Sequence, residues 1–170
     1  MKTCYVMVGL PATGKSTLGA EMREMNPDAF VYSTDIFIEE CAALNGITYD
    51  DAFLEFIKPA TKNMNERVEI AIRSNQDIIW DQTNTGVKKR SKIINRMKQA
   101  GYRVECHFIR PPGASQISDQ VEWKNRLNDR PGKTIPANII ASMSENLVEP
   151  TLDEGFDEIV VYNMYGIVLK

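Results

Sequence analysis

One glycine-rich segment near the amino terminus constrains the fold of this chain more than any other feature. Residues 9–17 read Gly-Leu-Pro-Ala-Thr-Gly-Lys-Ser-Thr, which matches in full the pattern of a glycine, any four residues and then Gly-Lys-Ser. A β-rich apolar run at 3–8 precedes the segment, and a helical pattern follows from about Lys15 to Met25. Backbone N–H groups in such a strand–turn–helix unit wrap around phosphates. The segment therefore predicts a phosphate-binding loop in an α/β fold.

The residues of this loop have distinct predicted roles in binding a nucleoside triphosphate and Mg²⁺. Small side chains let the backbone fold closely around the phosphates, and the N-terminus of the following helix adds positive potential. Lys15 should reach the β- and γ-phosphates, and the Ser16 hydroxyl should bind Mg²⁺. A chance glycine-rich turn is the alternative, but the flanking strand and helix argue against it. The predicted nucleotide-binding residues are Gly9, Pro11, Ala12, Thr13, Gly14, Lys15, Ser16 and Thr17.

Strand and helix patterns alternate along the rest of the chain. Further strands are expected at 30–33, 77–80, 103–109 and 158–162, with a short last one at 167–169. Further helices are expected at 35–44, 50–74, 87–100, 115–129 and 136–147. Pro59 should kink or split the helix in which it lies. This order predicts a P-loop NTPase three-layer sandwich, with a five-stranded, mostly parallel sheet. We expect one domain over 1–170, with a helical lid at about 115–136.

Bulk properties narrow the class of protein. The formal net charge of −3 and a pI of about 5.3 exclude a generally basic nucleic-acid-binding protein. No apolar run approaches the ~20 residues needed to cross a bilayer, and the amino terminus lacks the features of a signal peptide. We therefore expect a cytoplasmic protein that does not contact membranes. The three cysteines, Cys4, Cys41 and Cys106, show no metal-binding spacing, so we expect them to be inert thiols. We expect the single histidine, His107, to be a core or surface residue and not a metal ligand.

Two aspartates follow predicted strands, and open α/β sheets bind ligands at the carboxyl ends of their strands. Asp35 comes just after the second strand, where its carboxylate could take the proton of an attacking hydroxyl or could cap the next helix. Asp81 ends the third strand, where it could bind Mg²⁺ or act as an ordinary turn residue. Thr83 and Asn84 follow it, and they could hold an acceptor or tie Asp81 in place.

Basic residues are concentrated in the second half of the chain. Arg126 and Arg130 are four residues apart beside a Pro-Gly turn, so one helix face would carry both. With Lys133 they could close over a triphosphate as a lid, or they could form a solvated helix end. The helix at 87–98 could line an oligonucleotide path, although a solvated face is favoured. Its basic residues are Lys88, Lys89, Arg90, Lys92, Arg96 and Lys98.

Together these segments resemble the kinase domain of the polynucleotide 5′-kinases, from phages and from animal DNA-repair enzymes. The resemblance spans nearly the whole chain and includes the loop at 9–17 and Asp35 after the second strand. Asp81-Gln82-Thr83-Asn84 is similar to the family's Asp-x-Thr-Asn, and 125–136 is similar to its arginine-bearing lid. The segment Pro150-Thr151-Leu152-x-Glu154-Gly155-Phe156 is like that of the animal enzymes, and we expect it near the adenine.

The resemblance implies a mechanism in which ATP donates its γ-phosphate, with Mg²⁺, to the 5′-hydroxyl of a nucleic acid. Lys15 and Ser16 would hold the triphosphate and the metal, and Asp35 would be the general base. Arg126 would stabilise the transferring phosphoryl group, and Arg130 would join it at the nucleotide. The residues expected to organise the acceptor side are Asp81, Thr83 and Asn84, with Asp81 also serving the metal.

One position departs from the phage pattern. The phage enzymes carry an arginine three residues after the base, where it holds the acceptor's phosphate, and here that residue is Ile38. The departure and the acidic pI favour one alternative, a kinase of a small-molecule alcohol or nucleoside. A second alternative is a non-catalytic ATP-binding module, against which the pairing of Asp35 with an arginine lid argues.

Overall fold

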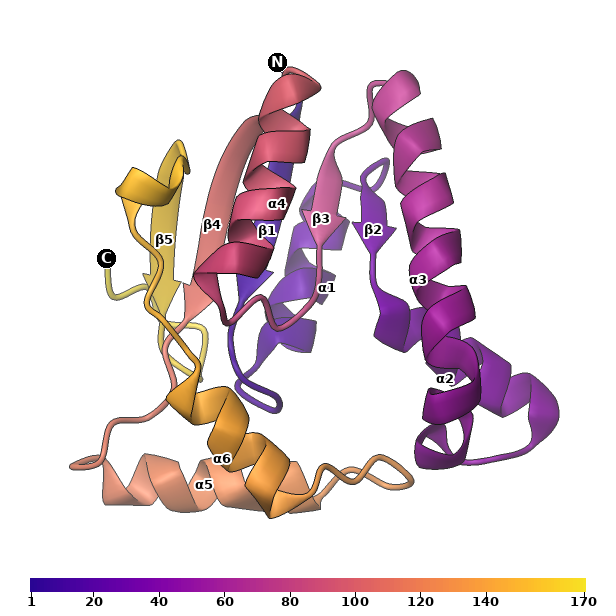
Figure 1. Ribbon diagram of the computed structural model, residues 1–170. Coiled ribbons are helices and arrows are strands. Elements are labelled where there is room, and N and C mark those ends of the chain that lie inside the picture. Colours follow the sequence, from indigo (N-terminus) through magenta and orange to yellow (C-terminus); the bar gives the residue numbers. More distant parts are fainter.

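Five parallel strands form the central layer of the protein. The computed structural model describes residues 1–170, and the strands lie in the order β2-β3-β1-β4-β5 (Figure 1). Their bounds are β1 Thr3–Val8, β2 Phe30–Tyr32, β3 Ile78–Trp80, β4 Arg103–Ile109 and β5 Glu158–Tyr162. Every neighbouring pair is parallel. The α/β fold class is thus confirmed, and 167–169 contributes only an isolated antiparallel bridge between Tyr162 and Val168.

Helices cover both faces of this sheet and its carboxyl end. They are α1 Lys15–Met25, α2 Thr34–Asn45, α3 Tyr49–Arg73, α4 Val87–Gln99, α5 Ile117–Asn128 and α6 Ala137–Glu145, with the short 3₁₀ helix η1 at Leu152–Glu154. Helices α3 and α4 pack on one face and α1 on the other, whereas α5 and α6 lie below the ends of the strands (Figure 1). None of the helices is long and apolar enough to span a bilayer.

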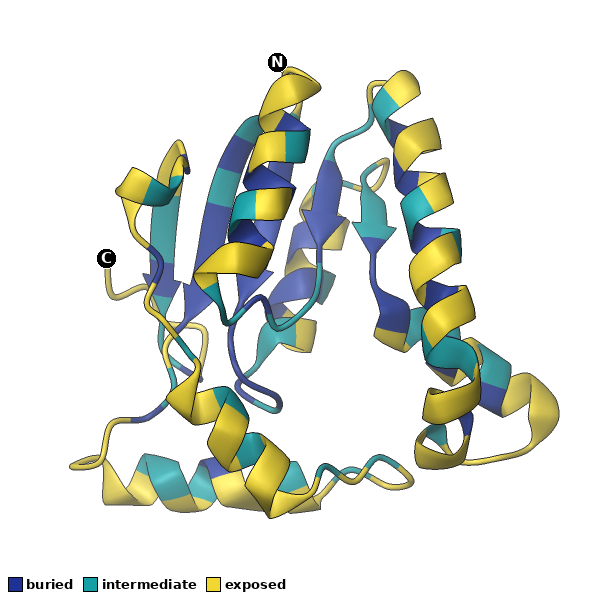
Figure 2. Ribbon diagram, viewed as in Figure 1, coloured by how far each residue is buried: buried dark blue, intermediate teal, exposed yellow.

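The two faces of the sheet are buried because alternate strand residues point to opposite sides. In β1, Val6 and Val8 join the larger core under α3 and α4, whereas Met7 joins the smaller core with Leu18 of α1. Figure 2 shows the resulting burial of the strands between helices whose outer faces are exposed. The near-continuous apolar runs that predicted these strands are the runs that a doubly covered parallel sheet requires.

Helix α3 runs without interruption through Pro59, so of the predicted kink or split the split does not occur. A proline removes one hydrogen bond and crowds the carbonyl of the residue four positions earlier, here Glu55. Both Pro59 and Glu55 are exposed, so water can satisfy the freed carbonyl. Ala52 and Ala60 pack against Ile38 and Ala42 of α2, and this packing holds the two halves of α3 in one helix.

A buried ion pair fixes the carboxyl-terminal segment to the sheet. The guanidinium of Arg90, in α4, donates two hydrogen bonds of 2.7 Å to the carboxylate of Glu154 in η1. It also donates to the backbone carbonyls of Asn84 and Thr85, at 3.1 and 2.8 Å. The side chains of Arg90 and Glu154 are 0% and 7% exposed. Arg90 is therefore a structural residue and belongs to neither a solvated face nor an oligonucleotide path.

Replacing one partner of this pair should cost stability. Arg90→Met should lower the free energy of unfolding by about 3–5 kcal/mol, because Glu154 would stay buried without a countercharge. Urea denaturation followed by circular dichroism measures the loss. The matched control is Arg96→Met, whose pair with Glu69 is partly exposed and should contribute about 0–1 kcal/mol. Equal losses in the two variants would contradict the structural role of the buried pair.

Candidate active site

A cavity of about 1510 Å³ opens at the carboxyl ends of β1, β2 and β3. Its walls are the loop after β1, the start of α2, the turn after β3, the start of α3, the segment from α5 to α6 and the loop after β5. Most of the residues selected from the sequence line it: Pro11, Ala12, Thr13, Gly14, Lys15, Ser16, Thr17, Asp35, Asp81, Thr83, Arg126 and Arg130. Gly9 and Asn84 do not line it. Parallel strands therefore bring together residues that lie far apart in the chain.

The loop after β1 has a backbone that only small residues allow. Ala12 and Gly14 have positive φ values of 60° and 108°, and a Cβ atom at Gly14 would lie 3.3 Å from the carbonyl oxygen of Met164. The Thr13 hydroxyl donates to the Leu10 carbonyl at 2.8 Å. Behind the loop, the N–H of Gly9 donates to the Thr83 carbonyl at 3.0 Å, so this glycine supports the loop from below.

Two cationic groups in the cavity lack an anionic partner. The Lys15 ammonium donates only to the Leu10 carbonyl, at 3.0 Å, and burial lowers the pKa of Lys15 to about 8. The Nη1 atom of Arg130 is buried and has no hydrogen-bond partner. Its charge, like those of Asp81 and Asp35, acts on the pKa of Lys15. Buried cations without partners are costly, and an anion such as a triphosphate between Lys15 and Arg130 would satisfy both.

The residues selected for Mg²⁺ fit that ion. Asp81 lies beside the first turns of α1, since its Oδ2 atom is 3.7 Å from the position of a Cβ on Gly19. Ser16 is one turn earlier on this helix and lines the same cavity. No cluster of three or more His, Cys, Asp or Glu side chains forms a metal cage. Mg²⁺ prefers one or two protein ligands together with phosphate oxygens and water, which agrees with one hydroxyl and one carboxylate.

Asp35 does not cap helix α2. Ser33 is the N-cap, and its hydroxyl accepts a hydrogen bond of 3.4 Å from the N–H of Ile36. The Asp35 carboxylate is therefore available to the cavity, where it accepts from the Tyr49 hydroxyl at 2.7 Å and from the Lys133 ammonium at 2.9 Å. Both oxygens have a partner, and the side chain is 54% exposed. The carboxylate is held in one orientation while a ligand can still reach it.

The two carboxylates of the cavity have opposite pKa shifts. Partial burial in the cavity raises the pKa of Asp35, but the charge of Lys133, the hydrogen bonds from Tyr49 and Lys133 and the charge of Lys15 together bring it below its usual value. The pKa of Asp81 is raised, first by burial and then by the charge of Asp35, although Lys15 lowers it. Asp35 thus stays ionised at lower pH than Asp81, as expected of a base that must be unprotonated.

The segment between α5 and α6 bridges the cavity to the start of α3. The carboxylate of Asp50 accepts two hydrogen bonds from the N–H of Thr134, at 2.8 and 3.0 Å, and the N–H of Asp50 donates to the Gly132 carbonyl at 3.0 Å. Lys133 bonds to Glu39 as well as Asp35 and lies 4.1 Å from the centroid of the Tyr49 ring. These contacts hold the segment across the mouth of the cavity.

Helix α5 is tied to the phosphate loop. The buried Trp123 indole donates to the Pro11 carbonyl at 2.8 Å and packs with Leu10 and Met164. Arg126, one turn further along, donates to the carboxylate of Glu122 and to the Met164 carbonyl, both at 2.9 Å. Its guanidinium also lies 5.3 Å from the centroid of the Tyr165 ring. Arg126 is therefore engaged by the loop after β5, whereas Arg130 also lines the cavity and its buried Nη1 atom has no hydrogen-bond partner.

In the turn after β3, Thr83 faces the cavity and Asn84 is buried in the protein. Thr83 lines the cavity, and the Gln82 amide donates to the Thr34 hydroxyl at 3.3 Å. Asn84 is fully buried with a φ of 48°, and its amide donates to the Met7 carbonyl at 2.7 Å. Of the two roles predicted for this residue, its position favours holding the turn, since its side chain does not reach the cavity.

The segment at 150–156, which we expect near the adenine, does not line this cavity. None of its residues lines the cavity, because Glu154 pairs with Arg90 and Phe156 packs into the larger core. The loop after β5 lines the cavity instead, through Asn163, Met164, Tyr165 and Gly166. No sequence motif marked these residues, and none marked Tyr49 or Asp50. Of the basic residues of α4, only Lys89 lines the cavity.

Comparison with known proteins agrees with this geometry. A family model described as an AAA domain, AAA_33, matches residues 5–150. The chain belongs to this family. This AAA domain has a P-loop kinase-like fold. Solved structures that share the fold include a fungal RNA kinase. It is 12% identical to this chain, with a TM-score of 0.54 over 96% of this chain and 75% of that one.

Two further structures share the fold of this AAA domain. A sugar kinase from a Janibacter species is 17% identical with a TM-score of 0.57, over 97% of this chain and 86% of that one. A protein of the PezAT toxin–antitoxin system of Streptococcus pneumoniae is 16% identical with a TM-score of 0.62, over 100% of this chain and 70% of that one. At such identities the likeness concerns the fold alone, and the acceptor must be inferred from the cavity.

Proposed function

We propose that this protein is an ATP-dependent kinase that transfers the γ-phosphate to the 5′-hydroxyl of a nucleic acid. One observation carries the proposal, namely the Asp35 carboxylate held between Tyr49 and Lys133 at 2.7 and 2.9 Å. It lines the same cavity as the phosphate loop. A switch or an assembly module that only binds nucleotide has no use for an oriented, ionised carboxylate beside the phosphates. Transfer to an alcohol does, because the attacking hydroxyl must lose its proton.

The proposed reaction begins with the triphosphate in the loop. Lys15 and Arg130 bind its phosphates, and Ser16 and Asp81 hold Mg²⁺, which neutralises charge on the phosphate oxygens when bound. The acceptor oxygen forms a bond to the γ-phosphorus as the bond from that phosphorus to the β–γ bridging oxygen breaks. The hydroxyl proton passes to the Asp35 carboxylate, and ADP leaves with the negative charge. Thr83 lies on the acceptor side, and Asn84 supports that turn.

The two lid arginines have different roles in the proposed reaction. Arg130 stabilises the charge that develops on the transferring phosphoryl group, because its Nη1 donor has no partner within the chain. Arg126, already bonded to the Met164 carbonyl, supports the loop after β5 and with it the nucleoside part of ATP. The sequence alone favoured Arg126 for the first role, and the two assignments make different predictions for single variants.

Incubation with γ-labelled ATP, Mg²⁺ and a 5′-hydroxyl oligonucleotide tests the function directly. We expect label on the 5′ end of the oligonucleotide. Absence of transfer from a folded protein that binds ATP would reject a nucleic-acid acceptor. A non-catalytic module predicts no transfer to any acceptor.

A small-molecule alcohol or nucleoside remains the second candidate acceptor, and one observation favours it. Ile38, where the phage enzymes have an arginine for the acceptor's phosphate, is fully buried with Ala42, Ala52 and Ala60. That position therefore supplies no cation to an acceptor phosphate. A panel of sugars and nucleosides in the same assay separates the two candidates, since this alternative predicts labelling of one of them in preference to the oligonucleotide.

Lys133 should set the pH range in which the proposed base works. The transfer rate falls as the pH falls through the pKa of Asp35, because the protonated carboxyl cannot accept the acceptor's proton. The charge of Lys133 is the first of the influences that lower this pKa. Lys133→Gln should therefore raise the pKa and move the acidic limb of the kcat/KM profile to higher pH. Lys124→Gln, an exposed change on α5, is the control, and an unmoved limb in Lys133→Gln would contradict this role.

A further inference from the structure

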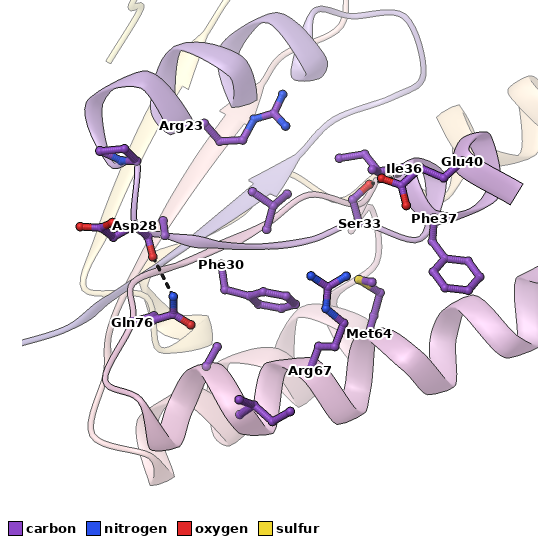
Figure 3. A pocket seen from close by; sticks show the side chains of 15 residues that line it. Arg23, Asp28, Phe30, Ser33, Ile36, Phe37, Glu40, Met64, Arg67 and Gln76 are labelled. Atoms are coloured by element: carbon purple, nitrogen blue, oxygen red, sulfur yellow. Dashed lines mark hydrogen bonds between the residues drawn. The ribbon is translucent and has the colours of Figure 1, made fainter. Parts of the chain in front are cut away.

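A second cavity, of about 600 Å³, lies along the open edge of the sheet. Strand β2 is the edge strand, and Figure 3 shows the cavity between it, α1, α3 and the first turn of α2. The N–H of Phe30 donates to Asp77, and the carbonyl of Tyr32 accepts from Asp81, so both residues pair toward β3. The backbone groups of Val31, between them, face the opposite way, into this groove.

The groove adjoins the active-site cavity. Arg23, Ser33 and Ile36 line both of them. Ser33 and Ile36 flank Asp35 in the chain, so the groove begins next to the proposed base. On the other side, the contacts of Asp50 with Gly132 and Thr134 close the cavity at the start of α3. An acceptor longer than one nucleotide must leave the cavity, and the groove along β2 is the neighbouring cavity that could receive it.

The chemistry of the groove suits a single-stranded nucleic acid. The Arg67 guanidinium lies 5.5 Å from the centroid of the Phe30 ring, and guanidinium and aromatic planes are surfaces on which bases stack. Neither Arg67 nor Arg23 forms a salt bridge within the chain, so both can bind phosphates. Figure 3 shows the two guanidinium groups on opposite sides of β2, with the carboxylate of Glu40 near the end at Ile36 and that of Asp28 near the other end.

We propose that this groove binds the acceptor strand, holding nucleotides that follow the one phosphorylated at its 5′-hydroxyl. Arg67 stacks on a base beside Phe30, Arg23 binds a phosphate, and the Val31 backbone can bond to base edges. Glu40 and Asp28 repel phosphates near the two ends of the groove and limit the affinity. The inference rests on the proposed function and deepens it, because a groove for further nucleotides selects a polynucleotide over a free nucleoside. Arg23 and Arg67 of the groove also provide positive charge for the acceptor's phosphates. The position of the buried Ile38 provides none.

Two acceptors that differ in length test the groove. One is a nucleoside 3′-monophosphate, which reaches only the cavity at Asp35, and the other is a single-stranded 5′-hydroxyl 10-mer. Arg67→Gln keeps the stem that covers Phe30 but removes the charge and the planar cation. It should raise KM for the 10-mer by about 10-fold, as expected for loss of one stacking and phosphate contact, and leave KM for the monophosphate unchanged. Glu40→Gln should act in the opposite direction and lower KM for the 10-mer.

Controls separate this inference from the function on which it rests. Arg73→Gln makes the same change on an exposed face of the same helix, outside both cavities, and should change neither KM. Fluorescence anisotropy of a labelled 10-mer reads binding without catalysis. If the wild-type protein transfers phosphate to neither acceptor but Arg67→Gln still weakens binding about 10-fold, the groove stands and the proposed function fails. Equal 10-mer binding and KM in wild type and Arg67→Gln would overturn the groove, whether or not transfer occurs, and would leave it to another occupant such as a peptide strand.

Discussion

Asp35→Asn should greatly slow phosphoryl transfer while the protein continues to bind ATP. The asparagine keeps the shape of the side chain, but its single carbonyl oxygen can replace only one of the two acceptors that Asp35 offers to Tyr49 and Lys133, at 2.7 and 2.9 Å. It cannot take the proton of the acceptor hydroxyl. General-base catalysis contributes roughly 10²–10⁴-fold to a rate, so kcat should fall by that factor. Single-turnover transfer of label gives the rate, and titration with a fluorescent ATP analogue gives the affinity.

Glu39→Gln is the matched control for this variant. Glu39 lines the same cavity and accepts from the same Lys133 ammonium at 2.9 Å. If Asp35 acted only by anchoring Lys133, both variants would lose activity to a similar extent. As a base, Asp35 alone should be required, and Glu39→Gln should keep kcat within about 10-fold of wild type. An Asp35→Asn variant as active as Glu39→Gln would mean that some other group takes the proton.

Much of the fold follows from local signals in the sequence. The strand at 103–109 and the strand at 158–162 are apolar runs bounded by polar or glycine residues, and the structure has both with the predicted bounds. The first helix also begins and ends as predicted, because the glycine loop sets its start and Asn26-Pro27 its end. The continuity of α3 through Pro59, where the sequence predicts a kink or a split, has a tertiary cause. The packing of Ala52 and Ala60 on α2 outweighs the lost hydrogen bond, and no local pattern reports that packing.

The candidate site was less predictable, because its geometry depends on pairs of distant residues. Asp35 was found from its place after a strand, but Tyr49 and Lys133 meet it from 14 and 98 residues away. The choice between a helix cap and a base was open in the sequence and depends on Ser33, which is the N-cap. Asn84 could have been an acceptor ligand by residue type alone. The buried hydrogen bond from Asn84 to the Met7 carbonyl of β1 forms only when the strands pair.

The lid arginines are the point at which sequence and geometry favour different residues. Arg126 and Arg130 are equivalent in a helical pattern of spacing four. In the structure α5 ends at Asn128, so Arg130 lies beyond the helix, where its charge acts on the pKa of Lys15. Arg126 stays on the helix and is bonded to the Met164 carbonyl and to Glu122. The end of one helix thus separates two residues that the sequence pairs.

Arg130→Gln should therefore lower kcat by about 10³-fold or more, the range in which arginines that stabilise phosphoryl transfer act. Arg126→Gln is its matched control on the same lid. It should mainly raise KM for ATP, by about 10-fold, through loss of the charge-assisted bond to the Met164 carbonyl. Steady-state kinetics with varied ATP separate the two effects, and circular dichroism confirms folding. A 10³-fold loss of kcat in Arg126→Gln, with Arg130→Gln little changed, would return the role to Arg126 and require its bond to Met164 to break before transfer.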